Sequence, residues 1–295
     1  MQTKEIKTAK PTGFAVISRE FLKDKLALFS LITLTAILLI VFVGSLFLNQ
    51  EQVMSVNIIS KNLPPGVNGH LLGTDSYGRD ILGQVIIGAR NSILIGFSIT
   101  IILSVIGISI GLISGYYGGR IDGILMRIVD FIMILPVLML IIVFVTIIDS
   151  YTVYHFIFIM SAFYWTGIAR LFRTRVLSEA SLDYVSASKT LGTSDLVIML
   201  REILPNISSL VIVNLTLNFA GNIGIETSLT YLGFGLPSTS PSLGTLIAYA
   251  RNQDVLQNKA WVWLPAAILI LVMMLSINYI GQAFQRVADA KQRLG

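Results

Sequence analysis

Long apolar stretches separated by shorter polar ones run through most of the chain. Six stand out: residues 26–48, 86–116, 124–148, 152–172, 207–232 and 260–283. Each can cross the hydrocarbon core of a bilayer as a helix, which takes about 20 apolar residues, because a helix satisfies its own backbone hydrogen bonds there. The pattern predicts an all-α integral membrane helix bundle with about six transmembrane helices. The second stretch exceeds one crossing, so we expect part of it to be buried or to extend beyond the bilayer.

The composition agrees with a membrane protein and excludes several other classes. Of the 295 residues, 54% are apolar and 13% are charged, about half the charged fraction of a soluble domain. Cysteine is absent, which excludes disulfides and thiolate metal ligands within the chain. The two histidines, His70 and His155, have no paired ligand spacing, so no metal site is predicted. The net charge is +5, but the positions of the basic residues indicate membrane topology and not nucleic acid binding.

The basic residues set the predicted orientation. With the N-terminus in the cytoplasm, the inner segments contain sixteen of the 21 lysines and arginines. The five on the outer side are Lys61, Arg79, Arg90, Arg251 and Lys259. This bias follows the positive-inside rule and places both termini in the cytoplasm. The first apolar stretch is longer than a signal-peptide core and no small-residue cleavage site follows it, so a retained spanning helix is expected.

The predicted organisation has four parts. Residues 1–25 form a cytoplasmic N-terminal segment, and residues 26–87 form the first transmembrane helix and an extracellular loop. The transmembrane core spans residues 88–284, and residues 285–295 form a cytoplasmic tail. In the extracellular loop, Thr74 or Asp75 is predicted to cap a short helix that runs toward Gly88.

A polar island interrupts the core at residues 178–206 and is predicted to be cytoplasmic. Its first half is predicted to be an amphipathic helix that ends at Gly192, a residue typical of the position after a helix C-cap. A second helix starts among Thr193, Ser194 and Asp195, and Pro205 then redirects the chain into the fifth apolar stretch. A helix, a glycine break and a second helix make a stiff elbow, which suits force transmission from a soluble partner. The alternative is a helix pair that only seals the bundle. The residues predicted at helical spacing in the first helix are Val185, Ala187, Thr190 and Leu191.

Polar residues also recur every four positions within the fifth apolar stretch: Asn214, Asn218, Asn222 and Glu226. This spacing places them along one face of a helix. Inside a membrane such a face turns toward protein or water. Two interpretations stay open: a wall of a translocation path, or hydrogen bonds between helices for assembly.

Two further motifs are assigned to packing and pairing. Gly107, Ser109 and Gly111 formally match the G-x-S-x-G elbow of hydrolases, but they lie within an apolar helix and the match lacks the required strand. Together with Gly115, the glycines form two overlapping G-x-x-x-G units, which predict close helix packing. Asp130 is interpreted as a helix-end or pairing residue and not as a proton relay. No catalytic residue is predicted.

The polar island resembles the EAA loop of ABC importer permeases. Residues Ser186, Ala187 and Ser188 occupy the Glu-Ala-Ala positions, and Gly192 and the pair Leu204 and Pro205 match. The resemblance assigns these residues, together with Leu191, to coupling with an ATPase. Ser186 replaces the acidic residue of the motif, and Glu179 and Asp183 are its possible substitutes.

The first outer loop resembles the signature of the C-type permease of oligopeptide and dipeptide importers. The signature residues are Gly73, Thr74, Asp75, Gly78, Arg79 and Asp80. The resemblance continues through residues 88–92, 226–235, 241–244 and 263–281 and covers almost the whole chain.

This resemblance implies a type I ABC importer transmembrane domain in a bacterial plasma membrane. It implies a homologous B-type permease, two cytoplasmic ATPase subunits and an extracellular peptide-binding protein as partners, with ATP and Mg bound by the ATPases and no cofactor on this chain. The absence of a G-x-x-x-x-G-K-[ST] phosphate loop agrees with this. Oligopeptides are the expected cargo, and dipeptides, nickel or metal chelates are alternatives. A more remote alternative is an ion-coupled secondary transporter, which needs buried midplane acids and usually inverted repeats.

Overall fold

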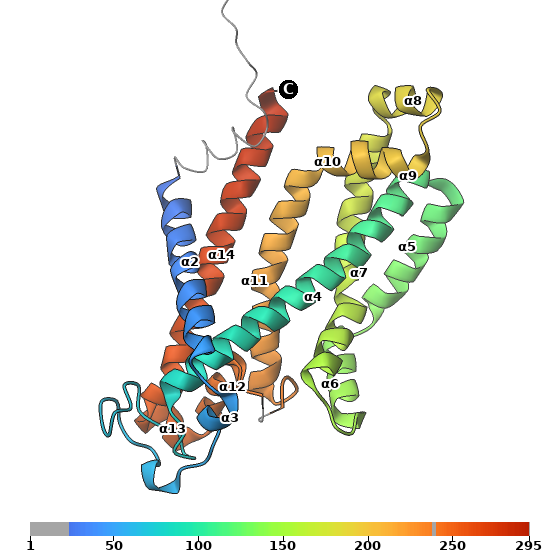
Figure 1. The fold of residues 1–295 in the computed structure, drawn as a ribbon. Helices are drawn as coiled ribbons and strands as arrows, with labels where there is room; N and C mark the ends of the chain where they lie inside the picture. Colours follow the sequence, from blue (N-terminus) through green and yellow to red (C-terminus); the bar gives the residue numbers. More distant parts are fainter. Residues whose placement is uncertain (1–23, 238–239, 295) are drawn as a thin grey trace, which may run out of the picture.

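The computed structural model describes residues 24–237 and 240–294, and within them the chain is helical with no β-strand (Figure 1). Five helices are long and apolar enough to cross a membrane. They are α2 (Lys25–Leu46), α4 (Ile81–Tyr117), α7 (Val153–Ala180), α11 (Ser208–Leu232) and α14 (Ala260–Leu294). The prediction of a membrane helix bundle is therefore confirmed.

The third predicted helix is broken. The chain forms α5 (Gly119–Ile134) and α6 (Val137–Ile147), which are bent by 73°. Pro136 lies at the break and Leu135 before it is extended, with ψ of 138°. A proline has no backbone N–H and disfavours helical geometry at the residue before it. The prediction of one continuous helix over residues 124–148 is wrong, and the bent pair counted as one span gives six spans.

The bundle has two different ends. One end, here called the elbow end, contains the C-terminal part of α14 and four short elements (Figure 1). These are α8 (Asp183–Thr190), α9 (Asp195–Val197), a π-helix (Ile198–Ile203) and α10 (Leu204–Asn206). The predicted cytoplasmic tail continues α14 as helix to Leu294, and most of the predicted N-terminal segment lies outside the described residues.

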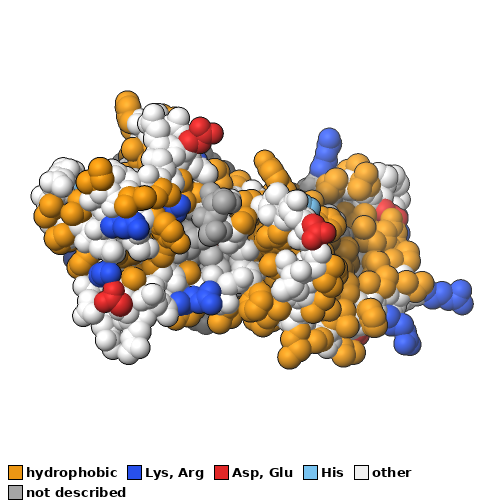
Figure 2. Space-filling view, turned by 90° about the horizontal axis from the view of Figure 1, so that it is seen from below, with side chains coloured by type: hydrophobic (Ala, Val, Ile, Leu, Met, Phe, Trp, Pro, Cys, Tyr) orange, Lys and Arg blue, Asp and Glu red, His pale blue; other side chains and the backbone are white. Residues whose placement is uncertain are grey.

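The opposite end, here called the loop end, contains the two long connections. The first includes α3 (Gln50–Val53) and the 3₁₀ turn η1 (Ile58–Ser60). The second includes α12 (Leu243–Ala248), η3 (Tyr249–Arg251) and α13 (Gln253–Asn258). In the view onto this end, acidic and basic side chains are few and are scattered among hydrophobic and uncharged polar side chains (Figure 2).

α4 and α7 pack closely through the glycines of α4. A Cβ atom added to Gly107, Gly111 or Gly115 would lie 2.7 Å from a side-chain atom of Ile168, Phe172 or Val176, respectively. Real Cβ contacts are essentially never shorter than 3.0 Å. The prediction that these glycines serve close helix packing is confirmed.

Two ion pairs join α5 to α7. Arg173 donates to both carboxylate oxygens of Asp122, and Ser114 of α4 donates to the same carboxylate. Arg170 donates to Asp130, so the prediction of a pairing role for Asp130 is confirmed.

Candidate coupling and transport sites

A glycine-dependent turn shapes the tip of the elbow. After α8 ends, Gly192 has a φ of +85° and no atom within 4 Å of where a Cβ would lie. Its N–H bonds to the carbonyl of Lys189, and the N–H of Thr193 bonds to the carbonyl of Ser188, at 3.1 and 3.2 Å. This pair of bonds defines a Schellman motif. The prediction that Gly192 ends the first helix is confirmed.

The elbow is held by apolar packing, by one hydrogen bond to α4 and by one hydrogen bond within itself. Val185, Ile198 and Ile203 are buried in the cluster that also contains the core residues of α4 and α7. The Tyr116 hydroxyl at the end of α4 donates to Asp195 at 2.7 Å. The Ser188 hydroxyl donates to Glu202 at 2.5 Å, which ties the two halves of the elbow together. The elbow is thus braced internally and against α4.

The tip of the elbow is exposed and partly apolar. Leu191 is 85% exposed, and Ala187 and Thr190 beside it are also exposed. Of the four residues predicted at helical spacing in the first helix, only Val185 is buried, so the predicted amphipathic pattern is wrong for the other three. Leu204 at the base is half-buried, and Pro205 is exposed.

The acids near the elbow have different environments. Ser186, which occupies the position of the family's acidic residue, is exposed. Glu179 is buried, paired with Arg175 at 3.0 Å and hydrogen-bonded by Tyr184 at 3.1 Å. Burial, together with the Glu179 charge, raises the pKa of the Tyr184 phenol. Glu179 is therefore engaged within the chain, whereas Asp183 is exposed.

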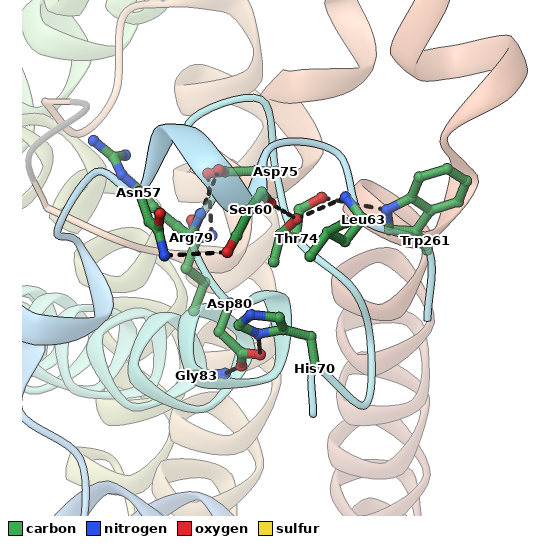
Figure 3. A network of polar contacts seen from close by, with 11 residues as sticks. Asn57, Ser60, Leu63, His70, Thr74, Asp75, Arg79, Asp80, Gly83 and Trp261 are labelled. Atoms are coloured by element: carbon green, nitrogen blue, oxygen red, sulfur yellow. Dashed lines mark hydrogen bonds and ion pairs between the residues drawn. The ribbon is translucent and has the colours of Figure 1, made fainter. Parts of the chain in front are cut away.

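At the loop end, the signature residues hold the first loop together (Figure 3). Asp75 is fully buried and accepts from the N–H groups of Tyr77 and Arg79 at 2.8 and 2.9 Å. Gln84 and Tyr249 also donate to it, both at 3.2 Å. Burial and the nearby Asp75 charge raise the pKa of Tyr249. Since Tyr249 belongs to the second connection, Asp75 joins the two long loops.

Thr74 and Trp261 extend this network to α14. The Thr74 hydroxyl donates to the carbonyl of Ser60 and accepts from the N–H of Leu63. The backbone carbonyl of Thr74 accepts from the indole N–H of Trp261. Gly73 and Gly78 have positive φ, and a Cβ on Gly78 would lie 1.8 Å from the carbonyl oxygen of Asn57. The signature therefore builds one compact scaffold from distant segments.

The start of α4 differs from the prediction. Asp80, and not Thr74 or Asp75, is the N-cap, and it accepts from the N–H of Gly83 at 2.8 Å. His70 contacts the second carboxylate oxygen of Asp80 at 2.7 Å. The helix that follows has 37 residues and is not a short separate element. Asp75 also accepts backbone N–H groups, as a capping residue does, but within the turn before the helix.

The polar stripe on α11 divides into two parts. Asn222 and Glu226 are buried: Asn222 donates to Thr100 of α4 at 2.8 Å, and Glu226 accepts from three hydroxyl groups. Asn214 and Asn218 are half-buried, and Asn218 donates to the carbonyl of Asn214. Of the two interpretations, hydrogen bonds between segments are confirmed for Asn222 and Glu226. That the four polar residues of the stripe line a path stays a prediction.

One cavity adjoins α4 and another adjoins α11. One, of about 380 Å³, lies at the loop end between α3, α4 and α7 and carries no charged residue on its lining. The other, of about 410 Å³, lies between α6, α7, α11 and α14. Residues that line the first include Gln50, Asn91, Ser98, Tyr154, Leu236 and Ser240. No group of three or more His, Asp or Glu that could hold a metal ion occurs in the described part of the chain.

A multi-helix membrane bundle with a braced polar elbow at one end and a compact loop scaffold at the other is the arrangement expected of a membrane transport subunit. Residues 107–294 match the model of the binding-protein-dependent transport system inner membrane component family. Residues 14–65 match the N-terminal transmembrane domain of oligopeptide transport permease C. The chain belongs to the binding-protein-dependent transport system inner membrane component family and is a permease component of an ABC-type transport system.

Individual relatives cover nearly the whole chain. The oligopeptide transport system permease protein OppC of Lactococcus lactis strain IL1403 is 53% identical over 276 residues, which is 94% of each chain. The oligopeptide transport system permease protein AmiD of Streptococcus pneumoniae is 35% identical, over 93% of this chain and 89% of its own. The dipeptide transport system permease protein DppC of Bacillus subtilis is 32% identical, over 93% of this chain and 85% of its own.

Proposed function

We propose that this chain is the C-type permease subunit of an ATP-driven importer for oligopeptides. The observation that carries the proposal is the 53% identity, over 94% of the chain, to an oligopeptide transport permease. The uncharged lining of the loop-end cavity supports it, because an importer for peptides of varied sequence has to accept both acidic and basic side chains.

The proposed orientation has the elbow end in the cytoplasm and the loop end outside. The basic residues of the elbow and of the neighbouring helix ends, Arg170, Arg173, Arg175, Lys189 and Arg201, support it by the positive-inside rule. In this orientation both termini are cytoplasmic and the scaffold around Asp75 is extracellular. Labelling of a Ser76→Cys variant tests it, since Ser76 is exposed and the chain has no other cysteine. Labelling only from the cytoplasmic side would refute the orientation.

The proposed partners are a homologous B-type permease, two cytoplasmic ATPase subunits that bind ATP and Mg, and an extracellular peptide-binding protein. The exposed tip around Leu191 is the proposed contact with one ATPase. It is connected to α4 through Asp195 and Tyr116, so movement of the tip would be passed into the bundle. The packing of the helices would then alternate between two arrangements that ATP binding biases. For the path, we propose the half-buried members of the stripe on α11, Asn214 and Asn218.

Reconstitution tests the proposal directly. The four-subunit complex is placed in liposomes with the binding protein and ATP, and uptake of labelled peptides of two to eight residues is measured. ATP-dependent uptake that prefers peptides longer than two residues is expected. Uptake of dipeptides alone would instead favour dipeptide transport, for which the Bacillus subtilis relative is named, and uptake of metal chelates alone would refute a peptide cargo.

A further inference from the structure

Glu226 occupies an unusual place in the bundle. It lies near the loop end of α11, is 0% exposed and has no ion pair among the described residues. Three hydroxyl groups donate to it: Ser92 of α4 to one carboxylate oxygen at 3.1 Å, and Thr230 and Ser242 to the other at 3.0 Å. These three residues are themselves buried and belong to three different segments.

Each of the three hydroxyl oxygens also accepts a backbone N–H. Ser92 accepts from Leu243, Ser242 from Thr245 and Thr230 from Leu236, each at 3.1 Å. A hydroxyl group has one proton to donate, and here that proton is directed at Glu226. Three relays therefore run from backbone N–H through hydroxyl to the same carboxylate.

The relays converge on residues 240–248, here called the return segment, and on Leu236 before it. The return segment contains α12 and packs among α4, α11 and α14. Backbone N–H groups that are buried away from water need a hydrogen-bond partner. The three hydroxyl oxygens accept the backbone N–H groups, and Glu226 is the common acceptor of the three hydroxyl protons.

Close approach of the backbone makes this arrangement specific. A Cβ on Gly244 would lie 2.8 Å from Cβ of Thr230 and 3.1 Å from a carboxylate oxygen of Glu226. A Cβ on Gly88 of α4 would lie 2.9 Å from the backbone of Ser242. The Asn91 side chain also donates to the carbonyl of Pro241 at 2.8 Å. The return segment is thus seated against two helices at once.

This seating shapes the loop-end cavity. Leu236 and Ser240 line the cavity of about 380 Å³ together with Asn91. Leu236 is held by the Thr230 relay, and Ser240 directly precedes Pro241, whose carbonyl accepts from Asn91, and Ser242, which donates to Glu226. A shift of the return segment would therefore change the wall of the cavity without altering its other lining residues.

We propose that Glu226 is a positioning residue for transport: through the three hydroxyl relays it fixes the return segment and thereby sets the fit of cargo at the loop-end cavity. The role rests on the proposed peptide import, and it differs from a direct contact between Glu226 and cargo. Glu226→Leu removes the common acceptor. Glu226→Gln keeps one oxygen for Thr230 and Ser242 and offers an N–H to Ser92, so it is the conservative variant.

Two measurements on the reconstituted complex test the role. The first is the labelling rate of a Ser240→Cys reporter in the otherwise cysteine-free chain. The second is KM and kcat of peptide uptake per assembled complex. Glu226→Leu is expected to raise the labelling rate about tenfold, as when a buried hydrogen-bonded group loses its partner, and to raise KM with little change in kcat. In Glu226→Gln the labelling rate and KM are expected to stay within about twofold of wild type, because the carboxamide still offers one acceptor oxygen.

Further variants keep the test decisive if Glu226→Leu does not assemble. Gly244→Ala retains all relay groups but displaces α12, and it is expected to raise KM in the same way. Thr216→Val is the matched control on α11, because the Thr216 hydroxyl donates only within its own helix, to Ile212. Wild-type labelling and KM in assembled Glu226→Leu, or in assembled Gly244→Ala, overturn the role. A lower melting temperature with unchanged KM also overturns it, because Glu226 would then serve stability alone. If the wild-type complex imports no peptide, the proposed cargo fails, and the labelling rates still report on the relays.

Discussion

Replacing Gly111 by alanine is expected to push α4 and α7 apart. The added Cβ would lie 2.7 Å from Cβ of Phe172, 2.9 Å from the carbonyl oxygen of Ala169 and 2.9 Å from the backbone nitrogen of Arg173. Two of these atoms are backbone atoms, so rotation of a side chain cannot relieve the contact. The helices must separate by about 1 Å to reach ordinary carbon contacts of roughly 3.5–4.0 Å. Overpacking of this kind costs about 1–3 kcal/mol, and one methyl group is too small to offset it.

The assay is unfolding of the purified chain in detergent micelles, followed by circular dichroism during titration with a denaturing detergent. Gly167→Ala is the matched control, because Gly167 lies on α7 with nothing within 4 Å of where its Cβ would be. Alanine is there expected to be neutral or stabilising by up to about 1 kcal/mol, from helix propensity. A wild-type midpoint for Gly111→Ala, or an equal loss for Gly167→Ala, would refute the packing argument.

Three further predictions concern the elbow, the loop scaffold and the stripe. Leu191→Asp or Gly192→Pro is expected to leave membrane insertion intact but to uncouple uptake from ATP hydrolysis; wild-type uptake with co-purifying ATPases would contradict it. Asp75→Ala removes the acceptor of four hydrogen bonds and is expected to destabilise the loop end by about 1–3 kcal/mol, because buried donors lose their partner. Limited proteolysis at the loop end should then be faster. Tyr249→Phe loses only one of these bonds and should have a smaller effect. Asn218→Leu is expected to change transport rate or peptide range while the complex assembles normally; a less stable complex with unaltered uptake per molecule would show that Asn218 only packs.

Features that depend on local backbone chemistry were predictable from the sequence. Gly192 ends a helix because it can adopt positive φ without steric cost, and its surroundings in sequence suffice to show it. The spacing of Gly107, Gly111 and Gly115 places all three on one face of a helix, so a close neighbour was expected even though the sequence does not show that the neighbour is α7.

Features that depend on distant residues were not predictable. The spacing of the stripe predicted that Asn222 and Glu226 share one face of a helix. It could not predict their partners Thr100, Ser92 and Ser242, because these lie on other segments. The cap of α4 was assigned wrongly because Asp75 and Asp80 both have side chains suited to capping, and tertiary hydrogen bonds decide between them. Pro136 is itself a signal for a helix break, but the length of the apolar stretch around it led to the prediction of one continuous helix.

The unbroken length of α4 has a mechanical consequence. Its 37 residues form a rod about 55 Å long, fastened near one end to the elbow through Tyr116 and capped at the other by the loop scaffold through Asp80. A tilt of about 5° about Gly111, the middle of the glycine contact with α7, would move the loop end of the helix by roughly 4 Å and its elbow end by about 1 Å, in opposite directions, because these ends lie about 45 and 9 Å from Gly111. We therefore expect α4 to act as a lever with unequal arms whose fulcrum is the glycine contact with α7, so that a small displacement at the elbow is amplified at the loop end.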